Sequence, residues 1–188
     1  MKITLAAGAL CLSAVAATGA EQSDVAAAFA RAQAAEWINH PAIVNAITAQ
    51  NTSTSLLQQS EINALDQTWR AEVGTTNAPL VTSVVGNPAS EHLRTHVASS
   101  GGQITEVFVM DARGLNVASS GVTSDYWQGD EAKWIETYMK GPDAIHVSDV
   151  EFDESTQTYQ VQVSLPVADS NGDVIGAVTF GIDAQSLF

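Results

Sequence analysis

Cysteine and basic residues are scarce in this chain. Its 188 residues include one cysteine and seven Lys or Arg against 21 Asp or Glu, which gives a formal net charge of -14. Sequence-independent binding to phosphate backbones needs many Lys and Arg side chains, so the composition argues against nucleic acid as a partner. It argues equally against docking on an anionic bilayer through a polybasic patch. A single cysteine, Cys11, cannot support a disulfide framework.

Recognisable catalytic motifs are also missing. The sequence has no G-x-S-x-G elbow, no phosphate-cradling glycine loop and no carboxylate pair flanked by convincing pocket residues. The lone cysteine lies in the N-terminal apolar run, where it cannot serve as a nucleophile of the mature chain. We therefore expect a protein that is not an enzyme and that carries no cofactor.

The long apolar run lies at the N-terminus. Met1-Lys2 is a short basic start, and residues 3–17 are apolar and rich in Ala and Leu. A spanning helix needs about 20 apolar residues, so the pattern predicts a cleaved signal peptide over residues 1–20, cut after Ala20 or alternatively after Ala17. The competing interpretation is a buried core helix. Without residues 1–20 the chain has six basic and 21 acidic residues, a net charge of -15. No later segment has the pattern of a membrane span, and we expect a soluble periplasmic or secreted product without membrane insertion.

The mature sequence changes its periodicity near Gly101-Gly102. Before that point, apolar residues recur at helical spacing, which predicts helices over about 25–37, 42–50, 56–73 and 87–97. Pro41 interrupts the first pattern, and the polar run 51–55 predicts a second break with a Ser or Thr cap. Asn87-Pro88 is typical of a helix cap followed by proline at the first helical position.

From Ile104 onward the apolar residues alternate with period two. We expect strands over 104–110, 115–119, 145–152, 159–167 and 174–182, with a short helix over 130–140 between the second and third. One face of the last two strands is apolar, and the other carries mostly Gln, Ser and Thr. The order predicts an α+β fold in which a helical segment, residues 21–100, and a sheet domain, residues 101–188, form one folded unit.

Three runs carry a family resemblance: Val107–Gly114 with its D-x-x-G hairpin, Asp125–Trp134, and Ser164–Asp169 followed by Gly172 and Gly176. In this order, behind N-terminal helices, the chain resembles an extracytoplasmic PAS-like Cache (PDC-type) sensor domain, here as a single module without transmembrane or output domains. The resemblance implies a PAS-like five-stranded antiparallel sheet with a short helical crossover. It also implies a small-molecule pocket between the sheet and the segments that follow the second strand.

Aromatic and charged residues gather in the crossover, a mixture that small-ligand sites need. Tyr126, Trp127 and Trp134 are expected to form an apolar wall, Lys133 and His146 to orient a polar or anionic group, and Asp130 to bind an amine. The alternative for Trp134 is that it packs the helix onto the sheet together with Tyr138, four residues on. The alternative for His146 is an ordinary core or surface histidine.

Two further patterns suggest metal ligands but fail in detail. His92 and His96 share a helical face, yet Leu93 and Arg94 stand where a zinc-protease motif needs its glutamate. The run Asp169–Asp173 opens like a calcium loop, but Val174 and Phe180 occupy the positions of the required Gly and Glu. We expect no metal at either place and a hairpin turn at residues 169–173.

These observations favour a periplasmic small-molecule-binding sensor-type protein that presents its ligand to a membrane receptor or histidine kinase. The alternative is an accessory subunit that binds protein through the helices of residues 24–73, and an enzyme ranks below both. A pocket smaller than a few water molecules, filled by the protein's own aromatic side chains, would favour protein docking.

Overall fold

The computed structural model describes residues 11–153 and 156–187. The N-terminal part of the chain forms five helices: α1 (Cys11–Trp37), α2 (Pro41–Thr54), α3 (Gln59–Glu72), α4 (Pro79–Val85) and α5 (Pro88–Ser99). The expected signal peptide lies in part outside the described residues, and α1 begins at Cys11. Within the described ranges, no helix combines the length and apolarity that crossing a membrane requires.

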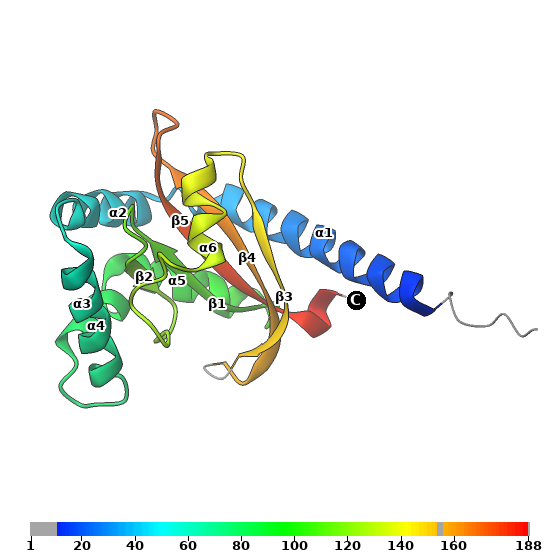
Figure 1. Ribbon diagram of the computed structural model, residues 1–188, viewed down its shortest axis with the longest axis horizontal. Helices are drawn as coiled ribbons and strands as arrows, with labels where there is room; N and C mark the ends of the chain where they lie inside the picture. The colour runs from blue at the N-terminus through cyan, green and yellow to red at the C-terminus, as the bar shows by residue number, and fades with distance from the viewer. Residues whose placement is uncertain (1–10, 154–155, 188) are drawn as a thin grey trace, which may run out of the picture.

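The C-terminal part forms the sheet and its crossover. Its elements are β1 (Ile104–Met110), β2 (Asn116–Ser119), α6 (Ala132–Ile135), η1 (Tyr138–Lys140), β3 (His146–Asp153), β4 (Thr158–Ala168), β5 (Val174–Asp183) and η2 (Ala184–Leu187). The strand order is β2-β1-β5-β4-β3, and all four pairings are antiparallel. The crossover through α6 therefore joins the two edge strands (Figure 1). The α+β fold with a five-stranded antiparallel sheet is confirmed.

One face of the sheet packs against helices and contains the main core. Side chains of β1, β4 and β5 that alternate along the strands, among them Val107, Val163 and Phe180, join buried residues of α1, α2 and α5 in one hydrophobic cluster. Trp37, near the end of α1, meets the Phe180 ring edge-on at 5.4 Å between centroids. This side is called the helix face below. Because the helices and the strands share this core, neither part buries its apolar residues without the other.

The opposite face, called the lid face, lies under the crossover. Cross-strand pairing aligns one row of residues over all five strands: Ser119, Phe108, Thr179, Ser164 and His146. The hydroxyl groups of Ser164 and Thr179 lie 2.9 Å apart and are buried. In Figure 1, α6 crosses the sheet on the side away from α1 and α5. The lid face is therefore buried and partly polar.

The helices differ from expectation in four places. The polar run 51–55 does not break α2, because the hydroxyl groups of Thr52 and Thr54 donate to carbonyls four residues earlier and stay within the helix. Helix α3 begins after Gln58, whose N–H donates to the Glu61 carboxylate at 2.8 Å, rather than after a Ser or Thr cap. Helix α4 is not predicted at all, and the helix over 130–140 is reduced to α6 and the short turn η1.

Candidate functional site

A loop between β2 and α6, residues 121–131, covers part of the lid face and is called the lid segment. Helix α3 holds it in place through backbone contacts. Asp66 Oδ1 accepts hydrogen bonds from the N–H groups of Tyr126 at 2.9 Å and Trp127 at 3.1 Å. The Trp69 indole N–H donates to the Thr123 carbonyl at 2.8 Å, and its ring stacks on Tyr126 at 5.5 Å.

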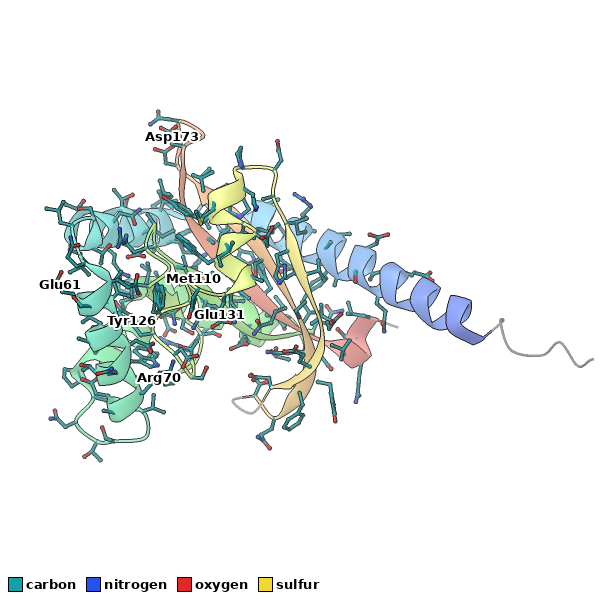
Figure 2. All side chains as sticks on the ribbon, viewed as in Figure 1. Glu61, Arg70, Met110, Tyr126, Glu131 and Asp173 are labelled. Carbon is teal, nitrogen blue, oxygen red and sulfur yellow. The ribbon has the colours of Figure 1, made fainter. Side chains whose placement is uncertain are left out.

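Two surface ion pairs of Arg70 complete this attachment. Arg70 Nε lies 2.8 Å from Asp66 Oδ2, and Arg70 Nη2 lies 2.9 Å from Asp125 Oδ1. The Arg70 side chain is largely exposed, so the pairs contribute little by themselves. The contact of Arg70 with Asp125 joins α3 directly to the lid segment. Figure 2 labels Arg70 and Tyr126, which lie at the place where α3 and the lid segment meet.

Beneath the lid segment, the sheet presents a buried carboxylate. Glu106 on β1 is 8% exposed. The amide groups of Gln160 and Gln162 donate to its Oε1 at 2.9 and 3.2 Å, and the Thr105 hydroxyl bonds to Gln160 Oε1. Burial raises the pKa of Glu106, against the opposing effect of the hydrogen bond from Gln160.

A glycine makes room for this cluster. Gly181 on β5 pairs with both Glu106 and Gln162 across the sheet. A Cβ atom at residue 181 would collide with Gln160 Oε1 and lie 2.8 Å from the Glu106 Cγ atom. A side chain here would displace the carboxylate and its donors.

Between the lid segment and the lid face lies a small space, partly open to solvent and called the lid cavity. Its volume is about 40 Å³, and its walls come from the loop, the sheet and α6: Glu106, Phe108, Thr123, Ser124, Gln128, Lys133, Asp153 and Gln162. That space holds no more than a few water molecules. A small polar molecule is the largest guest that fits while the lid segment keeps this position.

Gln128 is the least satisfied of the lining residues. It is 2% exposed, and its Nε2 donates to the Asp125 carbonyl at 3.1 Å. Its Oε1 is buried without a hydrogen-bond partner in the part of the chain that the structure describes. A buried acceptor left unpaired costs about 1–3 kcal/mol. A donor that entered the lid cavity and reached Oε1 would remove that cost.

Of the predicted ligand residues, only Lys133 lines the lid cavity. Its Nζ lies 2.9 Å from Glu131 Oε2 and 5.4 Å from the centre of the Phe108 ring. Trp127 and Asp130 line a different, open cleft of about 400 Å³ against α3. Tyr126 is 5% exposed and belongs to the hydrophobic cluster around Trp69.

The remaining two predicted residues lie on or near the lid face. Trp134 stacks on Tyr138 at 5.1 Å, packs with it against the sheet, and donates from its indole to the Asp111 carbonyl. The pair thus makes the sheet contact that the packing alternative describes. His146 is half-buried on β3 beside Ser164, and burial lowers its pKa. The ligand-binding role of the six residues stays a prediction.

Sequence reasoning passed over most of the cavity lining. Glu106, Gln128 and Gln162 were not singled out. The available signal was the polar face of the strand over 159–167, together with the polar residues Thr105 and Glu106 in the mostly apolar strand over 104–110. Polar side chains on a strand face usually indicate exposure to water. In this structure the crossover buries the face, so the polar side chains line a cavity instead.

Comparison with known proteins gives no family model and no curated relative. Matching solved structures include the sensory domain of the Campylobacter jejuni chemoreceptor Tlp3 with isoleucine bound, at 15% identity and a TM-score of 0.43, covering 94% of this chain and 63% of that one. The ligand-binding domain of the Pseudomonas fluorescens chemoreceptor CtaA with L-serine matches at 11% identity and 0.40, covering 68% and 60%.

The sensor domain of the V. cholerae histidine kinase DctB matches at 12% identity and a TM-score of 0.40, covering 88% of this chain and 59% of that one. This chain thus spans about three fifths of the length of these three structures. At such identities and scores, the likeness says nothing about the ligand of this chain. What it adds is that the matching structures include sensor domains of chemoreceptors and kinases.

Proposed function

We propose that this chain is an extracytoplasmic sensor-type protein that binds a small polar molecule in the lid cavity and presents it to a membrane receptor or histidine kinase. The observation that carries the proposal is the unpartnered, buried Gln128 Oε1 beside a cavity that the buried Glu106 also lines. Unsatisfied polar atoms are rare in protein interiors, and a ligand is one of the few reasons to retain them.

A purely structural role accounts poorly for the lid face. A face that only had to be buried would be stable with apolar side chains, as the helix face is. Instead, Glu106, Gln160, Ser164 and Thr179 are buried on the lid face. Burying a carboxylate costs free energy even when amides bond to it. The polar lining therefore supports binding rather than packing.

The size of the cavity limits the ligand. Sites for larger organic molecules have volumes of about 300–1,000 Å³, whereas the lid cavity has about 40 Å³. A ligand with more than a few non-hydrogen atoms would have to displace the lid segment from α3. The expected binding energy of a small ligand is correspondingly modest.

The attachment of the lid segment offers a route for a signal. A guest in the lid cavity contacts Thr123 and Gln128, and the same segment is bound to Asp66 and Trp69 of α3. Binding that moved or stiffened the segment would change these contacts. Helix α3 would then be the first element to respond.

A second candidate function is docking to a protein partner through the N-terminal helices, as an accessory subunit without a ligand. The small volume of the lid cavity favours it. The lining argues against it, because Phe108 is the single aromatic residue among the eight that line the cavity. The cavity is polar rather than filled by aromatic side chains.

Thermal unfolding in the presence of small amines, carboxylates and neutral metabolites tests the proposal. We expect at least one compound to raise the melting temperature of the wild-type protein and to lose that effect in Gln128→Met. Gln185→Met is the matched control, because Gln185 is exposed on η2. If no compound stabilised the wild-type protein, ligand binding would be rejected in favour of protein docking.

A further inference from the structure

Three of the four histidines of the chain meet where α1 ends, α2 begins and α5 packs against both. The rings of His40 and His92 stack with 4.1 Å between their centroids, and His92 meets His96 at 4.6 Å. The Trp37 ring stacks on His96 at 4.5 Å, and the Trp37 carbonyl oxygen lies 3.4 Å from His92 Nε2. The three imidazoles, called the histidine cluster, therefore join the corner between α1 and α2 to α5.

The histidine cluster lies at the rim of the main core. Trp37 belongs to that core and is 4% exposed, whereas His92 and His96 are half-buried and His40 is exposed. Protons can reach these rings from the solvent. A charged ring at such a position loses part of its hydration, so the neutral form is favoured.

His40 also caps a helix through a nitrogen that a proton would occupy. Its Nδ1 accepts a hydrogen bond at 3.2 Å from the Ala42 N–H in the first turn of α2. This ring therefore carries its hydrogen on Nε2. Protonation of Nδ1 gives an imidazolium that has donors only, and the Ala42 N–H loses its acceptor.

Positive charge on the other two rings is opposed as well. Burial lowers the pKa of His92, and His40 lowers it further, against the opposing hydrogen bond with the Trp37 carbonyl. Burial likewise lowers the pKa of His96, where His92 and His40 act in the same direction and Glu36 opposes them. Two charged rings at these distances repel each other, so each proton that the cluster binds makes the next one less favourable.

The surrounding elements offer little negative charge to offset such protons. Glu36 on α1 favours a charged His96, as does the position of His96 in the last turn of α5. On α5, Glu91 is already paired with Arg94 at 2.7 Å. Helix α2 contains no charged residue, and β5 meets Trp37 with an uncharged ring. Acidification therefore places positive charge at a junction with one nearby carboxylate to balance it.

A metal ion does not explain the cluster. Zinc and similar metals bind histidine through a ring nitrogen, but stacked rings turn their faces toward one another. Within residues 11–153 and 156–187, no group of three or more His, Cys, Asp or Glu side chains is arranged to hold a metal ion. The property that the three rings share is their response to protons.

We propose that the histidine cluster is a proton-sensitive latch, which when neutral holds the corner between α1 and α2 on α5 and in mild acid releases it. The opened state binds more protons than the closed one, because the pKa values of His92 and His96 lie below the ordinary value of 6.5 in the folded protein. The stability of the contact therefore falls as the pH is lowered from 6.5 through those lower values. The latch lies on the side of the helix face and does not depend on a ligand in the lid cavity.

Nuclear magnetic resonance of the four histidine rings, recorded from about pH 8 to about pH 4.5 on the full folded chain, tests the coupling. We expect the His96 midpoint to rise in His92→Phe, which keeps a flat ring but cannot bind a proton. His146 on β3 is the internal control, and its midpoint should be the same in both proteins. An unchanged His96 midpoint would show that the rings do not interact and would refute the latch.

Hydrogen exchange shows whether the corner opens. The N–H groups of Ile43 and Val44 bond to the His40 carbonyl at 2.9 and 3.2 Å and report on the start of α2. After correction for the intrinsic effect of pH, we expect them to exchange at least about tenfold faster at about pH 5.5 than at about pH 7.5. The Val163 amide in β4 should not accelerate. No acceleration at α2, or an equal one at Val163, would contradict a local latch.

Variants assign the opening to the cluster. His40→Asn keeps a side chain that caps helices well but binds no proton, and combined with His92→Phe it should abolish the acid response of Ile43 and Val44. His146→Asn is the matched control and should keep that response. Circular dichroism shows whether each protein is folded. If the double variant does not fold, His40→Asn alone, at an exposed position, decides by a reduced response, and a full response in it would refute the latch.

Discussion

The two faces of the sheet are both buried, yet they carry different side chains. The helix face is apolar throughout its central strands, with Val107, Val163 and Phe180 against α1, α2 and α5. The lid face carries Glu106 and the Ser164–Thr179 pair under the lid segment and α6. Exposure to water therefore does not explain the difference between the two faces.

Alternation along a strand lets the two faces serve different purposes. Successive residues point to opposite sides, so β4 and β5 supply the core with one set of side chains and the lid cavity with the other. The helix face is expected to carry most of the stability of the fold. The lid face is expected to carry the binding chemistry, at some cost in stability.

The largest expected loss of stability comes from a substitution on the helix face. Phe180→Ala removes a fully buried ring that contacts Trp37, and we expect a loss of about 3–5 kcal/mol in the free energy of unfolding, measured by urea denaturation. Tyr159→Ala is the matched control, because this ring is 59% exposed. Equal losses in the two variants would show that the helix face is not the dominant core.

The attachment of the lid segment comes next. Asp66→Ala leaves the N–H groups of Tyr126 and Trp127 without their acceptor, and we expect a loss of about 2–3 kcal/mol. Hydrogen exchange should accelerate at these two amides more than in β4. Asp130→Ala is the control, since Asp130 is exposed. Unchanged exchange would mean that α3 does not hold the lid segment.

On the lid face, we expect a smaller loss of stability at the Ser164–Thr179 pair, and a second substitution should recover most of it. Thr179→Val leaves the buried Ser164 hydroxyl without its partner, and we expect a loss of about 1–2 kcal/mol. Adding Ser164→Ala should recover most of it, because both polar groups are then gone. A double-mutant cycle in urea measures this coupling, and strictly additive losses would contradict it.

The smallest expected effect is a gain in stability when Glu106 is replaced. Burial raises the pKa of Glu106 above its ordinary value of 4.5. The folded state therefore binds more protons than the unfolded state between the two pKa values, and stability falls as the pH rises through that interval. Glu106→Gln should remove this loss and stabilise the protein at neutral pH by about 1 kcal/mol. Parallel urea titrations of both proteins between acid and neutral pH measure it, and a destabilised variant at neutral pH would show that the carboxylate supports the fold.

Most of the sheet could be predicted because its signal is local. The alternation of apolar residues gave β1 at its observed bounds, and the other four strands begin and end within one residue of the expected ones. Asn87 and Pro88 likewise open α5, with the Asn87 side chain accepting from the Ser90 N–H. Helix α4 was missed because seven residues are too few to show a helical period.

The site was harder to predict because its parts are distant in the sequence. Tyr126 stacks on Trp69, and Gln160 bonds to Glu106 across more than fifty residues. No local pattern reports such contacts. The polar face of β4 was visible in the sequence, but only the placement of the lid segment makes it a buried lining.

The side-chain amide signal of Gln128 in a ¹H–¹⁵N spectrum offers the most direct test of binding in the lid cavity. The spectrum is recorded while small amines, carboxylates and neutral metabolites are titrated into the protein. The account predicts that a binding compound shifts this signal in a saturable way, while the exposed Gln185 amide stays unchanged. A compound that bound without moving the Gln128 signal would place its site elsewhere and contradict the account.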